Sequence, residues 1–150
     1  MNAPVTDPGR DAIDVEALME SPKRFLNREL SWVQFNLRVL EEAENPNHPV
    51  FERLRFLSIS ASNLDEFYMV RVAGLRAQLH SGVTSPSIDG LTPSQQLEEI
   101  HQLAGELMVK QQVLWRKLKG DIAEAGVRLL EADEVSKTDE AWLRGDFLKH

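Results

Sequence analysis

The polar run Ser62–Phe67 (SNLDEF) holds the side chains in this sequence that are best suited to bind a ligand. Ser62 with Asp65, and Asn63 with Glu66, have the spacing of helix-capping boxes. On the ordinary interpretation, Asn63 is the N-cap of a helix that starts at the next residue. If Ser62 is the cap instead, the Asn63 amide is unpaired and offers both the donor and the acceptor that the edge of an adenine ring can use. The residues alone leave both interpretations open.

The remaining polar residues predict neither a catalytic residue nor a metal site. Asp65 and Glu66 are adjacent, so on a helix they point about 100° apart and cannot share a metal ion without other ligands. In a first helical turn their charges would favour the helix dipole. The histidines lie far apart, with no serine or acid arranged around them: His48, His80, His101 and His150. The sequence also lacks a glycine-rich phosphate loop, a zinc-protease motif and a nucleophile elbow.

The arginines of the middle segment are the groups that could meet an anion. Arg53 and Arg55 lie on either side of a predicted helix, and we expect both to face solvent. Arg71 follows Glu66 by five residues, which is not a spacing that pairs charges on a helix. Arg71 is therefore available to a partner domain.

The composition favours one domain and argues against binding to nucleic acid. The chain has 150 residues, of which 42% are apolar, enough for a hydrophobic core. It has no cysteine, which excludes disulfides and cysteine-ligated zinc and agrees with a reducing compartment. A net charge of −7 disfavours binding to a polyanion. No apolar run approaches the roughly 18–20 residues that cross a bilayer. We expect a cytoplasmic protein, with peripheral contact with the inner membrane as the alternative.

Three helices are predicted in the first half of the chain, over about residues 31–44, 49–61 and 64–80. Ser31 and Gln34 form a capping box that would open the first helix. The polar residues after position 61 predict an interruption between the second and the third. Gly82 is expected to end the third as its C′ residue. The aromatic residues are expected in the core: Trp32, Phe35, Phe56 and Tyr68.

A long helix is predicted to begin after Thr92. Thr92 and Gln95 have capping-box spacing, and Pro93 stands at the first helical position, where its missing N–H costs nothing. Apolar residues then recur at helical spacing for about nine turns. The helix is expected to end at Gly120 or Gly126.

These elements divide the chain into three parts. Residues 1–22 are acidic and contain three prolines, which predicts a mobile tail with at most one helical turn. Residues 23–126 form an antiparallel helical bundle, so the fold class is mostly α. Residues 127–150 begin with an extended segment, and Ser136 with Asp139 then opens a last helix. The sequence stops inside that helical pattern, as a truncated chain would.

Several motifs resemble one known family. They are Arg28–Trp32 (RELSW), Phe35-Asn36, Arg38–Ala43 (RVLEEA), Glu52–Leu54 (ERL), Ser62–Phe67 (SNLDEF) and Val70–Leu75 (VRVAGL). Together they resemble the N-terminal domain of the large bacterial polyphosphate kinases, which move the γ-phosphate of ATP onto polyphosphate. The resemblance is dense over residues 25–76. Val33 and Ala61 depart mildly from the family, which often has leucine and serine there.

The resemblance implies a helical N-terminal domain that forms part of the adenine pocket, with Asn63 at the position of an ATP-contacting asparagine. It implies that residues 127–150 open the family's α+β head domain. The magnesium site, the polyphosphate site and the phospho-accepting histidine of the family belong to later domains. The expected ligands are therefore ATP and polyphosphate, with Mg²⁺ bound elsewhere in a homo-oligomeric enzyme. The 150-residue chain alone is expected to be inactive. The alternative is a helical protein-interaction module without enzyme activity.

Overall fold

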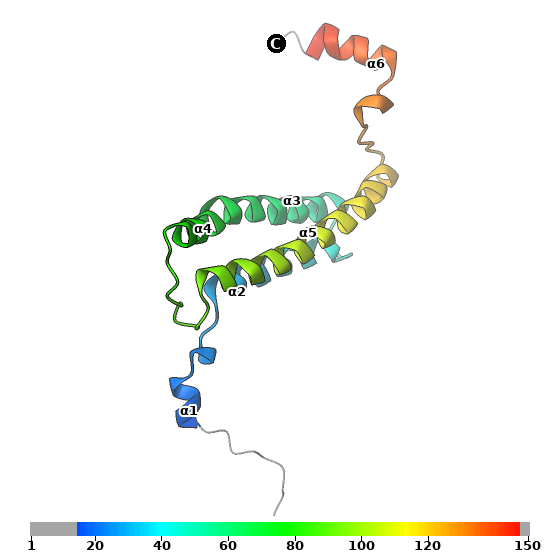
Figure 1. Ribbon diagram of the computed structural model, residues 1–150. Helices are drawn as coiled ribbons and strands as arrows, with labels where there is room; N and C mark the ends of the chain where they lie inside the picture. The colour runs from blue at the N-terminus through cyan, green and yellow to red at the C-terminus, as the bar shows by residue number, and fades with distance from the viewer. Residues whose placement is uncertain (1–14, 148–150) are drawn as a thin grey trace, which may run out of the picture.

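Three helices lying side by side make up the main body of the protein. The computed structural model describes residues 15–147 (Figure 1). The three helices are α2 (Arg28–Glu44), α3 (Val50–Phe67) and α5 (Pro93–Glu124), and each packs against the other two. A π-helical turn, η2 (Tyr68–Val72), continues α3 into α4 (Ala73–His80), which packs on α5. The described residues contain no strand, so the mostly α fold is confirmed.

Short elements flank this bundle at both ends. The N-terminal ones are α1 (Val15–Glu20) and η1 (Pro22–Arg24), and the C-terminal ones are η3 (Ala132–Glu134), α6 (Lys137–Trp142) and η4 (Leu143–Phe147). In Figure 1, α6 lies beyond the C-terminal end of α5, away from the bundle. Residues 1–14 and 148–150, including His150 and most of the predicted tail, lie outside the described part. The tail and head-domain assignments therefore stay predictions.

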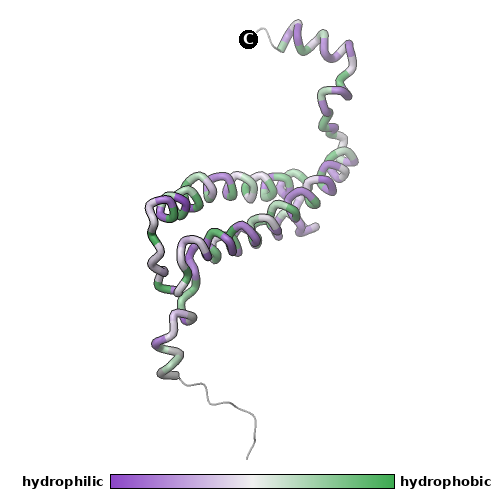
Figure 2. Tube along the Cα trace, in the orientation of Figure 1, coloured by the Kyte–Doolittle hydropathy of each residue, from purple (hydrophilic) through white to green (hydrophobic). Residues whose placement is uncertain are grey.

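The core lies where α2, α3, α4 and α5 face one another. Apolar and polar residues alternate around these helices in Figure 2, as they do when one helix face is buried. The apolar residues with no more than 2% exposure show which faces these are: Val33, Leu40, Ala43, Phe67, Val72, Ile100, Ala104, Leu107, Leu118 and Ile122. The described helices include none that is both long and apolar enough to cross a membrane.

The predicted ends of the long helix and of α4 are confirmed. Thr92 and Gln95 form a reciprocal capping box at the start of α5, with Pro93 at the first position. Gly82 follows α4 with φ 75° and Gly126 follows α5 with φ 90°, in the left-handed region that only glycine enters without strain. Ser136 caps α6 as predicted, by accepting from the Asp139 amide.

The predicted start of the first helix at Ser31 is wrong. Helix α2 begins at Arg28, because the Asn27 side chain accepts hydrogen bonds from the backbone N–H groups of Glu29 and Leu30. The Asn27 amide nitrogen also donates to Asp89, at 2.6 Å, in the loop before α5. A cap held by a distant residue thus takes precedence over the local Ser31 pattern.

The predicted interruption near Ala61 is also wrong, and neither Ser62 nor Asn63 is an N-cap. Helix α3 is continuous through this segment as far as Phe67. Its buried face includes Leu57, Ser60 and Leu64 as well as Phe67, with the i, i+3, i+7 and i+10 spacing of a helix packed on one side. Burial of this face outweighs the tendency of Ser62 and Asn63 to end a helix. The irregularity in the backbone comes one turn later, at η2.

Two expectations about burial are wrong. Phe35 was expected in the core but is 48% exposed, and Arg53 was expected in solvent but is only 8% exposed. Helix α2 packs against both α3 and α5, so the helix presents Asn36, rather than Phe35, to the interior. Arg53 turns inward because its guanidinium meets a carbonyl at the end of α2. Trp32, Phe56 and Tyr68 are partly buried against the core, and Arg55 is exposed as predicted.

Candidate functional site

A cavity of about 200 Å³ lies between α2, the end of α3 and η2. Its lining includes Asn63, the ligand-binding residue proposed from the sequence. The full lining is Trp32, Phe35, Asn63, Glu66, Phe67, Val70 and Arg71. Helices α2 and α3 form a close pair, and this pairing brings together two sequence segments about thirty residues apart.

Stacked aromatic rings form one wall of the cavity. The Trp32 indole lies on the Phe67 ring with centroids 4.4 Å apart and planes 9° from parallel. Tyr68 forms a T-shaped contact with Phe67, with centroids 6.2 Å apart. Phe67 is buried at 2% exposure, so its ring holds Trp32 in place. Of the two rings, only Trp32 is exposed enough to offer a flat apolar surface to the face of a planar ring.

The π-helical turn η2 sets the direction of the residues at the other side of the cavity. At its end the Ala73 N–H donates to Tyr68 O, five residues back. The extra residue in the turn shifts the side-chain positions relative to a regular α-helix, and such turns occur often at functional sites. Val70 and Arg71 both come from this turn and both line the cavity.

Asn63 is held by a polar network that crosses the bundle. Its Nδ2 donates to Oδ1 of Asn36 at 3.3 Å, and Nδ2 of Asn36 donates to the backbone oxygen of Ser60 at 2.9 Å. Gln111 of α5 donates to the Ser60 hydroxyl at 2.9 Å. Asn36 and Ser60 are both 0% exposed. The network therefore joins α2, α3 and α5, and Asn63 is its member that lines the cavity.

The charged residues of the cavity do not pair with each other. Nη1 of Arg71 lies 3.9 Å from Oε1 of Glu29, at the start of α2. Within the described chain Glu66 has no ion-pair partner, which agrees with the expectation that Glu66 and Arg71 do not pair. The site thus carries one acid and one partly neutralised base.

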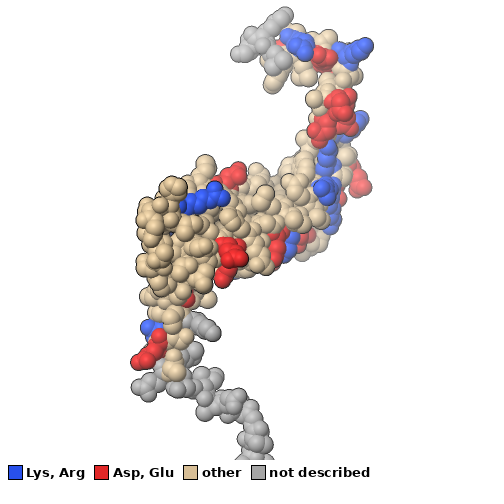
Figure 3. Space-filling view, viewed as in Figure 1, with Lys and Arg blue, Asp and Glu red and all other residues tan. Residues whose placement is uncertain are grey.

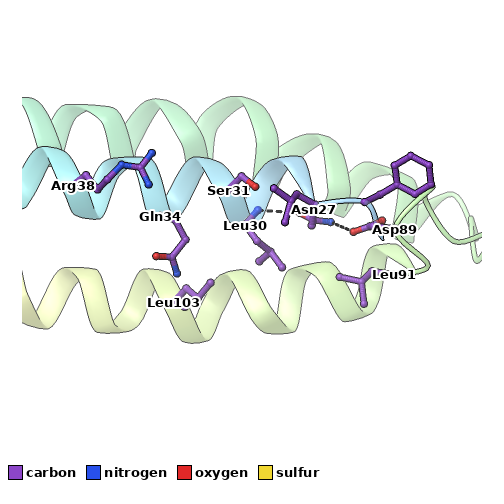
Figure 4. Close-up of a pocket in the computed structure, with 10 residues that line it drawn as sticks. Asn27, Leu30, Ser31, Gln34, Arg38, Asp89, Leu91 and Leu103 are labelled. Atoms are coloured by element: carbon purple, nitrogen blue, oxygen red, sulfur yellow. Dashed lines mark hydrogen bonds between the residues drawn. The ribbon is translucent and has the colours of Figure 1, made fainter. Parts of the chain in front are cut away.

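A second, wider cavity of about 690 Å³ lies at the start of α2, beside the loop that precedes α5. Figure 4 shows its residues: Asn27 donates to Asp89 across the mouth, and Gln34 of α2 points toward Leu103 of α5. Although burial raises the pKa of Asp89, hydrogen bonds from Ser87, Asn27 and two backbone amides lower it by more, so the net pKa lies below 3.8. These contacts hold the loop before α5 against the start of α2, and Asn63 does not line this cavity.

The described residues contain no group of three or more His, Asp or Glu side chains that could hold a metal ion. His48 pairs with Glu42 at 2.9 Å in the turn after α2. His80 and His101 do not line the Asn63 cavity. The face shown in Figure 3 carries only scattered Lys and Arg over α3, α4 and the first half of α5. Basic side chains gather instead beside the C-terminal end of α5.

Sequence reasoning singled out Asn63 but missed the residues that surround it. Neither the Trp32–Phe67 stack nor the bond from Asn63 to Asn36 is visible in local spacing. One signal was present: Asn36 lies three residues after Val33 and four before Leu40, both of which belong to the core. A polar residue at a core position of a helix is a candidate for a buried network.

Comparison with known proteins shows the family. Residues 25–130 match the model of the polyphosphate kinase N-terminal domain. The chain is 46% identical over 136 residues to a polyphosphate kinase of Erythrobacter litoralis, an alignment that covers 91% of this chain and 19% of that protein.

Two further relatives give the same result. A polyphosphate kinase of Prochlorococcus marinus is 44% identical over 126 residues, covering 83% of this chain and 18% of the relative. Polyphosphate kinase 1 of Chlorobaculum tepidum is 40% identical over 133 residues, covering 87% of this chain and 19% of the relative. The chain thus spans about a fifth of the length of these curated relatives. It belongs to the polyphosphate kinase N-terminal domain family.

Proposed function

We propose that this chain is the N-terminal part of a polyphosphate kinase that transfers the γ-phosphate of ATP to polyphosphate, and that the Asn63 cavity forms part of the adenine pocket. The observation that carries the proposal is the position of the Asn63 amide beside the flat Trp32–Phe67 wall. An aromatic wall can contact the face of a base while an amide contacts its edge. The names of the relatives support the reaction.

The charges around the Asn63 cavity indicate which part of ATP this region binds. Phosphoryl transfer requires metal ions and clustered positive charge around the transferring group. The Asn63 cavity offers one arginine, which already pairs with Glu29. The cavity is suited to a neutral base, so we assign the phosphates, Mg²⁺ and polyphosphate to the remainder of the enzyme. This remainder, and a second copy of the enzyme, are the partners that we expect.

The alternative, an interaction module without enzyme activity, rests on exposed apolar residues of α5. Met108, Val109 and Val113 are each more than half exposed and lie on one side of the helix. Such a patch can bind another domain of the same enzyme as well as a separate protein. Because the relatives are named polyphosphate kinases, we favour the enzyme.

The test is Asn63→Ala in the full-length enzyme. We expect the KM for ATP to rise about fivefold to tenfold with little change in kcat, since the substitution removes binding but no reacting group. The matched control is Ser62→Ala, because Ser62 is exposed, adjacent and outside the cavity lining. If Asn63→Ala lowers the melting temperature and leaves the KM for ATP at the wild-type value, Asn63 is a structural residue only.

A further inference from the structure

The Ser60 carbonyl determines which atoms donate and which accept in the network that includes Asn63. A carbonyl oxygen can only accept hydrogen bonds. The group 2.9 Å from Ser60 O must therefore be the Nδ2 of Asn36, and not its Oδ1. Asn36 is 0% exposed, so no solvent is available to satisfy a flipped amide. Flipping would place the Asn36 oxygen against the Ser60 carbonyl oxygen in a buried site and remove this hydrogen bond, which is costly.

The orientation of Asn36 then determines that of Asn63. With its Nδ2 directed at Ser60, Asn36 presents Oδ1 to Asn63. The atom of Asn63 that faces this oxygen must therefore be a hydrogen-bond donor. That atom is the Nδ2 of Asn63, at 3.3 Å. Among the described residues, no group donates to the Oδ1 of Asn63. Asn63 therefore brings to the cavity one oxygen acceptor and one remaining N–H.

We propose that Asn36 is a positioning residue that holds the Asn63 amide so that its oxygen accepts from an exocyclic amino group of the bound base. This inference rests on the proposed function and gives that site a base preference. A purine with an amino group at position 6 supplies the donor that the oxygen needs. A purine without that group leaves the oxygen unpaired, and a site built around such a bond discriminates against the analogue that lacks it.

Gln111 offers a comparison within the same network. It donates to the hydroxyl of Ser60, while Asn36 donates to the Ser60 carbonyl. Removing Gln111 therefore weakens the packing of α5 on α3 but leaves the chain from Ser60 O through Asn36 to Asn63 intact. If Asn36 contributes only to stability, replacing Asn36 should have the same effect on the enzyme as replacing Gln111.

The experiment compares ATP with purine riboside triphosphate, which lacks the 6-amino group, in the full-length enzyme. For the wild type we expect kcat/KM to favour ATP by roughly fivefold to tenfold, the effect of one hydrogen bond. Asn36→Leu should abolish most of this preference, mainly through KM, while Gln111→Leu should retain it. If Asn36→Leu does not fold, Asn36→Ala replaces it.

The outcomes separate this inference from the proposed function. If Asn63→Ala leaves the KM for ATP unchanged, the adenine-pocket proposal is wrong and this inference falls with it. If Asn63→Ala raises that KM but Asn36→Leu keeps the wild-type preference, only the positioning role of Asn36 is wrong. A wild-type enzyme that uses the two triphosphates equally well overturns the inference without any variant.

Discussion

Replacing Arg53 by methionine should destabilise the protein although Arg53 lies outside the Asn63 cavity. Its Nε donates to the backbone oxygen of Ala43 at 3.0 Å, and its Nη1 lies 3.0 Å from Oδ2 of Asp121. Ala43 is in the last turn of α2, where the carbonyl groups have no partner within the helix. One guanidinium thus caps α2 from α3 and connects both to the end of α5.

The magnitude follows from these contacts. Methionine keeps the apolar stem of the side chain but removes every donor, which leaves the carbonyl of Ala43 without this bond at a cost of about 1–3 kcal/mol. The lost ion pair adds only about 0.5–1 kcal/mol, because the side chain of Asp121 is 35% exposed. The sum is about 1.5–4 kcal/mol. For a chain of this size that corresponds to a fall in melting temperature of about 3–16 °C.

Thermal unfolding of the 150-residue chain, followed by far-UV circular dichroism, measures this change. The matched control is Arg55→Met, because Arg55 is exposed on the same helix and, among the described residues, its one ion pair is with Glu52 at 3.6 Å. We expect that control to change the stability by less than about 0.5 kcal/mol. Asp121→Asn should have a smaller effect than Arg53→Met, since the bond to Ala43 remains. An Arg53→Met variant as stable as Arg55→Met would refute the capping role of Arg53.

Two further predictions concern acid stability and catalysis. Because the folded-state pKa of Asp89 lies below its ordinary value of 3.8, its contribution to stability is present above that pH and is lost as the pH falls through the folded-state pKa. Wild type should therefore be more stable than Asp89→Asn near neutral pH, with the difference shrinking in acid unfolding below about pH 4; a constant difference would contradict this. The purified 150-residue chain with ATP, Mg²⁺ and polyphosphate should transfer no phosphate, and radiolabelled polyphosphate formed above background would show that the chemistry lies within it.

The sequence by itself determined the features that depend on a few neighbouring residues. The Thr92–Gln95 capping box and the glycines after α4 and α5 were identified correctly, because a cap or a positive φ is decided within one turn of the chain. The motif residues were also sufficient to identify the family, which the comparisons confirm. Asn63 was selected for its amide and for its neighbours in sequence.

The tertiary structure decided which of these residues are buried and what they contact. Asn63 lies inside a continuous helix, and one N–H of its amide donates to Asn36 of another helix. Arg53 is buried because the end of α2 offers it a carbonyl, and Asn27 replaces Ser31 as a cap because Asp89 holds it. Each of these outcomes joins segments that are ten to seventy residues apart. Local spacing carries no information about such pairs, because burial and hydrogen bonding between helices exist only once the helices have packed.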